Sequence, residues 1–219
     1  MGGTAISKQA LQRMPYYLQQ LKLLQREGAE IATATMVAGM LRLGEVQVRK
    51  DFAAVCPRKG KPKTGFPLRE LIENMELLLG YNSVKDAVLV GAGSLGRAFL
   101  SYDAFRDYGM NIAAAFDCDP KVTGRAVNGK EVLPMEALEG YCRAREVLIG
   151  IITCPASAAQ EVCDRLVGSG ILAIWNFAPA HLIVPENILV QDENMAASLA
   201  LLSRHLNDKL ESERRSARP

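Results

Sequence analysis

The stretch Ala87-Val88-Leu89-Val90-Gly91-Ala92-Gly93-Ser94-Leu95-Gly96-Arg97-Ala98-Phe99-Leu100 decides the fold class of this chain. An apolar run leads into glycines spaced G-x-G-x-x-G, and an apolar, helix-forming run opens after the third glycine. Strand, glycine turn and helix in this order make the dinucleotide-binding fingerprint. The stretch therefore predicts an α/β fold with a Rossmann-like, doubly wound parallel sheet.

Each glycine has its own predicted task. Gly91 permits the tight turn, Gly93 leaves the backbone bare where a pyrophosphate approaches, and Gly96 lets the helix pack close to the strand. The N–H groups and the dipole at the start of the helix then favour the phosphate charge. The predicted cradle consists of Gly91, Ala92, Gly93, Ser94, Leu95 and Gly96.

A second apolar strand, 111–116, ends at Asp117, which lies 21 residues beyond Gly96. A carboxylate at this place can bind the hydroxyls of the adenine ribose and would repel a 2′-phosphate. The predicted cofactor is therefore NADH or NAD⁺ rather than their phosphorylated forms. The alternative is an α/β turn that binds no phosphate, with Asp117 as a surface acid.

The length and composition of the chain limit its domain number, its location and its metal or disulfide content. Its 219 residues suffice for one large domain or two small ones. No apolar stretch of about 18 residues occurs and the N-terminus has no signal-peptide pattern, so a cytoplasmic protein is expected. The five cysteines are scattered without C-x-x-C spacing, which favours neither a disulfide framework nor a metal site.

The front of the chain is basic. Residues 1–82 contain twelve Lys and Arg against seven Asp and Glu, whereas the remainder has fourteen against seventeen. This asymmetry suggests a nucleic-acid partner for the first part. Predicted helices at 35–42 and 45–55, joined by a turn with Gly44, fit a helix-turn-helix, although a small helical bundle with solvated charges fits as well.

In a helix-turn-helix the second helix enters the major groove. Gln47 can then read adenine, Arg49 can read guanine or bind phosphate, and Lys50 is expected to bind phosphate. A basic loop follows, and it predicts the wing of a winged helix, which would track the DNA backbone. Its cations are Arg58, Lys59, Lys61 and Lys63.

Apolar spacing predicts the remaining helices of the first part. Leu11, Met14, Leu18 and Leu21 form one stripe, with Pro15 in the first turn of that helix. A second amphipathic helix is predicted over 68–79, with Leu68, Leu71, Ile72, Met75, Leu78 and Leu79 facing inward.

Two further strands are predicted to end at the ligand edge of the sheet. The segment 147–152 leads into Thr153 and Pro155, and 171–174 leads into the sequence from Trp175 to Pro179. Between them and the fingerprint, Asn128-Gly129 predicts a type I′ hairpin turn. A terminal helix with Met195, Leu199, Leu202, Leu206 and Leu210 on one seam could pack on its own domain or on a second subunit, and the tail from Ser212 is expected to fray.

Taken together, these segments resemble the Rex family of redox-sensing transcriptional repressors. The resemblance rests on the segments 48–51, 91–96, 116–120 and 174–179 and covers nearly the whole chain. It implies a winged-helix DNA-binding domain at 1–80, a Rossmann domain for NAD(H) at 81–190, and a helix at 191–219 that is exchanged between subunits.

The resemblance further implies a homodimer that binds a palindromic DNA operator and is released when NADH binds. Tyr102, in the helix after the fingerprint, would surround the nicotinamide together with Thr153, Pro155, Asn176, Phe177 and Ala178. The sequence has Asn194 where the family usually carries Asp at the start of the terminal helix.

Two other functions fit the sequence. The same fold serves NAD-dependent oxidoreductases, but only His181 and His205 are available as histidine acids or bases, and no substrate domain remains. A DNA-binding regulator whose Rossmann domain serves only for dimerisation is the third possibility. It would bind its operator equally with and without nucleotide.

Overall fold

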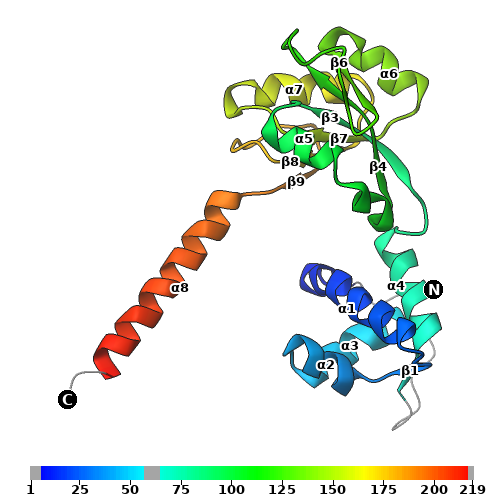
Figure 1. Ribbon diagram of the computed structural model, residues 1–219, viewed down its shortest axis with the longest axis vertical. Helices are drawn as coiled ribbons and strands as arrows, with labels where there is room; N and C mark the ends of the chain where they lie inside the picture. Colours follow the sequence, from blue (N-terminus) through cyan, green and yellow to red (C-terminus); the bar gives the residue numbers. More distant parts are fainter. Residues whose placement is uncertain (1–5, 57–64, 217–219) are drawn as a thin grey trace. The chain divides into compact units, whose positions relative to one another are not determined.

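The computed structural model describes residues 6–56 and 65–216. The chain divides into two compact units (Figure 1). Unit 1 runs to Val84 and includes Asp107–Gly109, whereas unit 2 comprises Lys85–Arg106 and the chain from Met110 onward.

Unit 1 is a helical domain with a small antiparallel sheet. One core holds its helices together, with Tyr17, Phe52 and Met75 among the fully buried side chains. Its elements are α1 (Lys8–Arg26), β1 (Ile31–Ala32), α2 (Ala34–Leu41), α3 (Glu45–Val55), β2 (Phe66–Pro67) and α4 (Leu68–Leu79). Strands β1 and β2 pair with each other, and residues 57–64 of the segment predicted as the wing lie outside the described part of the chain.

The predicted helix-turn-helix is present. The side chain of Thr33 caps α2 by accepting a hydrogen bond from the N–H of Met36 at 3.1 Å, and α2 ends where Arg42 adopts a left-handed conformation. Gly44 then serves as the N-cap of α3. Local signals thus set both ends of the connection between α2 and α3.

Three details of the predicted helices were wrong. Pro15 lies inside α1 rather than in its first turn, because Ser7 caps the helix and starts it earlier. Leu11 is 38% exposed, whereas Tyr17, which the predicted stripe did not include, is fully buried. Leu78 on α4 is 40% exposed, since the buried face of that helix narrows after Met75.

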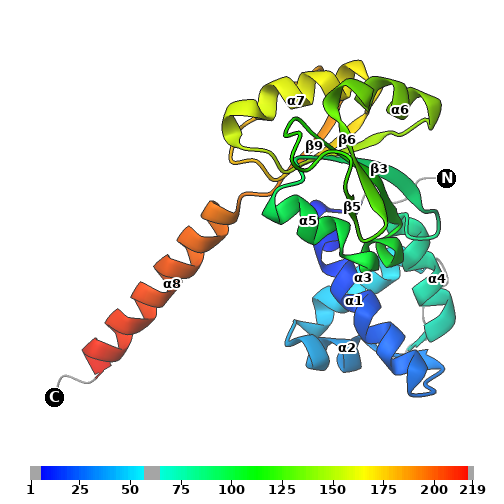
Figure 2. The same ribbon diagram turned by 45° about the horizontal axis from the view of Figure 1, so that its top comes forward.

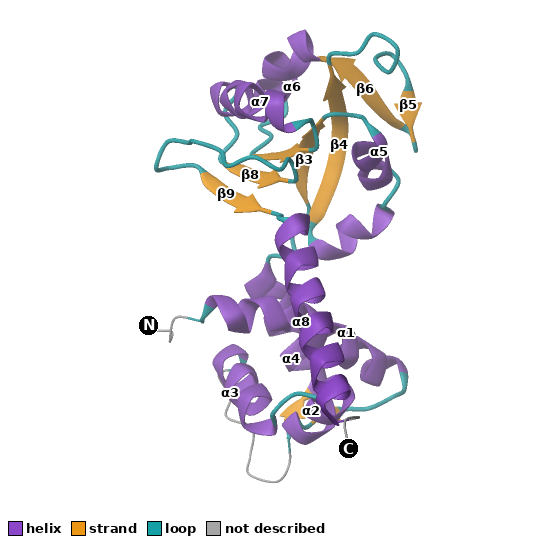
Figure 3. Cartoon of the chain, turned by 90° about the vertical axis from the view of Figure 1, so that its left-hand side faces the viewer, coloured by secondary structure: helices purple, strands orange, loops and turns teal. Residues whose placement is uncertain are grey.

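Unit 2 contains a seven-stranded sheet with the order β5-β6-β4-β3-β7-β8-β9. Figure 3 labels these strands except β7. All neighbouring pairs are parallel except β5 and β6, which form the predicted hairpin around Asn128 and Gly129, both with positive φ. The strands are β3 (Lys85–Val90), β4 (Met110–Asp117), β5 (Ala126–Val127), β6 (Lys130–Pro134), β7 (Ile149–Ile152), β8 (Ala173–Asn176) and β9 (Leu189–Asp192).

Helices cover both faces of this sheet, as a doubly wound fold requires. In Figure 2, α6 (Leu138–Ala144) and α7 (Ala156–Gly168) lie above the sheet and α5 (Ser94–Leu100) lies below it. Alternate residues of β3 serve the two cores: Val88 and Val90 pack on the side of α6 and α7, and Ala87 and Leu89 on the side of α5.

Unit 2 differs from the sequence prediction at several places. Helix α5 starts at Ser94, before the third glycine rather than after it, and β7 and β8 each start two residues later than predicted. Strand β9 was not foreseen. Helix α8 (Met195–Ser216) continues past Ser212, where the ion pair between Lys209 and Glu213, at 4.0 Å, spans one turn of the helix.

Candidate nucleotide and nucleic-acid sites

The strand order of unit 2 reverses at β3, which has β4 on one side and β7 on the other. Ligands of doubly wound sheets bind outside the carboxyl ends of the strands at such a point. The glycine turn, Asp117 and Thr153 follow or end these three strands, so the fold brings them to one edge.

Protein packing alone accounts for two of the three glycines. Gly91 has a φ of +105°, and a Cβ there would lie 2.8 Å from the backbone nitrogen of Cys154. A Cβ on Gly96 would overlap the carbonyl oxygen of Gly91, so the absence of a side chain lets α5 approach β3 as predicted. A Cβ on Gly93, by contrast, would meet no described protein atom within 4 Å.

The start of α5 offers backbone donors. Gly93 is its N-cap, and within the described chain no side chain forms a cap hydrogen bond. The first N–H groups of a helix have no partner inside the helix, so those after Gly93 are available to an anion. Ser94 is exposed, Leu95 is half-buried and Ala92 is buried beneath the turn.

Asp117 is the last residue of β4 and is half-buried. Its Oδ2 accepts a hydrogen bond from the N–H of Ala92 at 2.7 Å, and its Oδ1 accepts one from the N–H of Asp119 at 2.9 Å. These contacts tie the carboxylate to the glycine turn. Because each carboxylate oxygen can accept a second hydrogen bond, Asp117 can still receive ribose hydroxyls.

The end of β7 is fastened to the same turn. Thr153 donates from Oγ1 to the carbonyl of Gly91 at 2.8 Å, and its N–H donates to the carbonyl of Val90 at 2.9 Å. Pro155 is the exposed N-cap residue of α7. The two residues thus lie at the same edge of the sheet as the glycine turn.

Aromatic side chains gather beside the end of β8, a feature that the sequence analysis did not foresee. Phe177 lies 4.7 Å from Phe99 of α5 and 4.7 Å from Trp175, measured between ring centroids. Phe105 lies 5.9 Å from Trp175 and 4.9 Å from Tyr102. Tyr102 is exposed and follows α5 rather than lying within it, as had been predicted.

Asn176 holds the loop after β8 from inside. It is 1% exposed, and its Nδ2 donates to the carbonyl of Ala180 at 2.9 Å and to Oδ1 of Asp192 at 2.8 Å. Its Oδ1 accepts from the N–H of Ala178 at 3.0 Å. With these partners Asn176 shapes the loop that presents Phe177, and Ala178 is buried within that loop.

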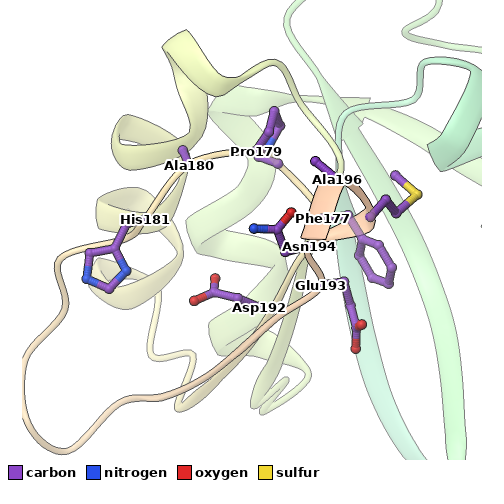
Figure 4. Close-up of a pocket in the computed structure, with 10 residues that line it drawn as sticks. Phe177, Pro179, Ala180, His181, Asp192, Glu193, Asn194 and Ala196 are labelled. Carbon is purple, nitrogen blue, oxygen red and sulfur yellow. The ribbon is translucent and has the colours of Figure 1, made fainter. Parts of the chain in front are cut away.

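A cavity of about 570 Å³ lies between this loop and the start of α8. Figure 4 shows Asp192, Glu193 and His181 around it with Phe177. Asn194 caps α8 by accepting from the N–H of Ala197 at 2.9 Å. Asp192 and Glu193 therefore supply the carboxylates of this cavity, next to Asn194.

The predicted DNA contacts of α3 are exposed, but two of them have partners within the helix. Gln47 donates from Nε2 to Oδ1 of Asp51 at 3.0 Å, and Arg49 is paired with Glu45. Lys50 is exposed. The four cations of the predicted wing, Arg58, Lys59, Lys61 and Lys63, lie outside the described residues.

Asp51 was not anticipated as part of the site. It occupies a buried position between Val48 and Phe52, on the apolar face of α3. An acidic residue on the apolar face of a predicted helix could have indicated this network, because a buried charge requires hydrogen-bonded partners. Its partners are Arg13 and Tyr17, one turn apart on α1.

Comparison with known proteins bears on both units. Residues 5–53 match a family described as a putative DNA-binding protein N-terminus, and residues 82–180 match the CoA binding domain family. The redox-sensing transcriptional repressor Rex of Treponema denticola is 37% identical over 91% of this chain and 95% of its own length. The chain belongs to the Rex family of redox-sensing transcriptional repressors.

Further Rex proteins agree. The repressor of Carboxydothermus hydrogenoformans is 36% identical over 93% of this chain and 97% of its own length. The Rex-family repressor RSP in complex with β-NAD⁺ and operator DNA superposes with a TM-score of 0.85 at 28% identity, covering 99% of this chain and all of that one. The complex of RSP with β-NADH gives 0.83 at 29% identity, over 96% and 99%.

Membership in the Rex family confirms the predicted fold class and sets aside the oxidoreductase, because these relatives are transcriptional repressors. In the described part of the chain, no three His, Cys, Asp or Glu side chains are grouped so that they could hold a metal ion. None of the described helices is long and apolar enough to cross a membrane.

Proposed function

We propose that this chain is a repressor that binds a palindromic operator as a homodimer and is released from it when NADH binds. Gly93 carries the nucleotide part of the proposal. Packing explains why residues 91 and 96 are glycine but leaves space at 93, where a pyrophosphate would need a bare backbone. The RSP complexes with NAD⁺, NADH and operator DNA support the same assignment.

The proposed site has one group of residues for each of three portions of the cofactor. The cradle 91–96 binds the pyrophosphate, and Asp117 binds the adenine ribose. The nicotinamide lies near Tyr102, Thr153, Pro155, Phe177 and Ala178, with Asn176 acting by holding the loop. The buried partners of Asn176 favour this positioning role over direct contact with the ring.

The proposed DNA-binding domain is 1–80, the Rossmann domain 81–190 and the dimer-forming helix 191–219. Helix α8 presents one apolar stripe whose side chains are 42–66% exposed in the single chain, which suits contact with a second copy. The stripe consists of Met195, Leu199, Leu202, Leu206 and Leu210. Because operator DNA and the NADH pool occur in the cytoplasm, the proposal places the protein there.

The decisive experiment is fluorescence anisotropy of the protein on a labelled palindromic operator, titrated separately with NADH, NAD⁺ and NADPH at fixed salt. Fixed salt is essential because phosphate contacts make affinity strongly dependent on ionic strength. We expect NADH alone to release the DNA. Operator binding that ignores all three nucleotides would refute redox sensing and favour the uncoupled DNA-binding regulator.

A further inference from the structure

The predicted base-reading residue Gln47 is exposed, but it donates a hydrogen bond to a network of unit 1 that is centred on the buried Asp51. Asp51 is 5% exposed. Its Oδ2 accepts from Nε of Arg13 at 2.9 Å and from the hydroxyl of Tyr17 at 2.8 Å. Its Oδ1 accepts from Nη2 of Arg13 at 3.2 Å and from Nε2 of Gln47 at 3.0 Å.

The chemistry of the side chains fixes which groups of this network donate hydrogen bonds and which accept them. Burial, followed by the hydrogen bond to Asp51, raises the pKa of Tyr17 to about 12, so its hydroxyl remains a donor at neutral pH. A guanidinium has donors and no acceptor, so Arg13 can only donate. Nε of Arg13 also donates to the hydroxyl oxygen of Tyr17 at 3.1 Å, so that hydroxyl turns its own proton toward position 51. The residue at position 51 therefore accepts, and an ionised carboxylate accepts at both oxygens.

This arrangement of donors and acceptors fixes the orientation of the Gln47 carboxamide. Its amino group points toward Asp51 and uses one N–H there. The carbonyl oxygen and the second N–H remain for the solvent side, where Gln47 is exposed. The side chain therefore offers one acceptor and one donor to a DNA groove.

One acceptor beside one donor matches adenine, whose major-groove edge carries the N6 donor and the N7 acceptor. Guanine presents two acceptors, N7 and O6, which require two donors. We propose that Asp51, held by Arg13 and Tyr17, is a positioning residue that restricts Gln47 to adenine and excludes guanine. The inference rests on the proposed role of α3 as the recognition helix.

The variant Asp51→Asn makes the inference testable because it reverses one hydrogen bond. We expect the asparagine oxygen at the place of Oδ2, where Nε of Arg13 and the hydroxyl of Tyr17 donate and which Nη2 of Arg13 also reaches, at 2.9 Å. Its amino group then faces Gln47 and donates to the carbonyl of that side chain. Gln47 turns over and presents two N–H donors to the groove, which matches guanine.

The experiment is competitive anisotropy with operators in which each base pair is replaced in turn in both half-sites. For the wild-type protein, replacing the adenine read by Gln47 with guanine should weaken binding by roughly 5- to 150-fold per site. Gln47→Ala should abolish this preference at that position only. Asp51→Asn should abolish or invert it, and Lys50→Ala, which removes a predicted phosphate contact, should weaken all operators equally.

The readout is the ratio of the affinities for the operators with adenine and with guanine at this position, because loss of a negative charge alters binding to every DNA. A uniform change in Asp51→Asn, like that of Lys50→Ala, would mean that Asp51 is merely structural and would overturn the inference. An unaltered adenine preference in Asp51→Asn, or in Gln47→Ala, would overturn it as well.

A measurement without DNA separates this inference from the proposed function. In ¹⁵N-labelled wild-type protein, the side-chain amide of Gln47, assigned by its disappearance in Gln47→Ala, should have one proton that exchanges more slowly than those of exposed glutamines. Equally fast exchange of both protons would overturn the Asp51 contact even if Asp51→Asn failed to fold. Failure of the wild-type protein to bind any palindromic operator would refute DNA recognition by α3, and the inference with it, whatever this spectrum gives.

Discussion

Replacing Gly93 with alanine separates ligand binding from folding. A Cβ at this position meets no described atom within 4 Å, and the φ of −68° is one that alanine adopts readily. Lower entropy of the unfolded chain favours alanine by about 0.4–1 kcal/mol. Its poorer capping of α5 costs about as much. The free energy of unfolding should therefore stay within about 1 kcal/mol of the wild-type value.

Affinity for NADH should fall in the same variant. The added methyl group stands where the pyrophosphate would accept hydrogen bonds from the backbone at the start of α5. Loss of one hydrogen bond to a charged group costs about 1.5–3 kcal/mol, which corresponds to a roughly 10- to 150-fold weaker affinity.

Gly96→Ala is the matched control, since the same methyl group should act in the opposite way there. Its Cβ would overlap the carbonyl oxygen of Gly91 and lie 3.0 Å from Cδ2 of Leu89. Overpacking of this kind costs about 1–3 kcal/mol or more, because α5 must move away from β3. Gly96→Ala should thus lower the stability of unit 2 before any ligand is added.

The fluorescence of Trp175 can measure both the stability of unit 2 and the affinity for NADH. It is the only tryptophan of the chain, and it lies in unit 2 beside Phe177. Its fluorescence should report the urea unfolding of that unit, and energy transfer to bound NADH should report affinity. If Gly93→Ala bound NADH as tightly as wild type, the pyrophosphate would not lie against the backbone at Gly93. This result would refute the assignment of Gly93 to the cofactor site. A loss of stability as large as that of Gly96→Ala would contradict the open space at this position.

Three further predictions concern other parts of the chain. Asn176→Ala leaves the N–H of Ala178 without its partner and should lower the free energy of urea unfolding by about 1–3 kcal/mol; unchanged stability would contradict the role of Asn176 in the loop. The pKa of Tyr17 is about 12 in the folded protein against 10 ordinarily, so its contribution is present below pH 10 and is lost as the pH rises toward 12. Urea unfolding followed by circular dichroism should therefore show a steeper alkaline loss in wild type than in Tyr17→Phe, and equal slopes would count against the buried network. Leu202→Glu, in the middle of the stripe on α8, should convert dimers to monomers in sedimentation analysis; a persistent dimer would exclude the stripe from the interface.

Local signals explain why much of the fold could be predicted. The predicted bounds of α3 and α4 agree with the structure because Gly44 caps one helix and Gly80, in a left-handed conformation, ends the other. The hairpin at Asn128-Gly129 was predicted correctly for the same kind of reason, since both residues need positive φ. In these cases the decisive interaction lies within a few residues of the signal.

Interactions between distant segments could not be predicted in this way. Asp51 meets Arg13 across 38 residues, and Phe99 stacks with Trp175 from another part of the chain. No spacing in the sequence relates these residues before the fold is known. Strand β9 was missed because its side chains are mostly exposed, so it lacks the apolar pattern of a central strand.

The start of α8 is tied to the strand end that holds the proposed nicotinamide site. Asp192 accepts a hydrogen bond from Asn176 at 2.8 Å, and the side chain of Glu193 accepts one from Trp175 at 3.0 Å. The backbone N–H of Glu193 also donates to the carbonyl of Asn176 at 2.8 Å. Helix α8 begins at Met195, two residues further on. A ligand that shifts the end of β8 therefore acts on the first turn of the helix that carries the proposed dimer stripe, and this shared element is what coupling between nucleotide and subunit arrangement requires.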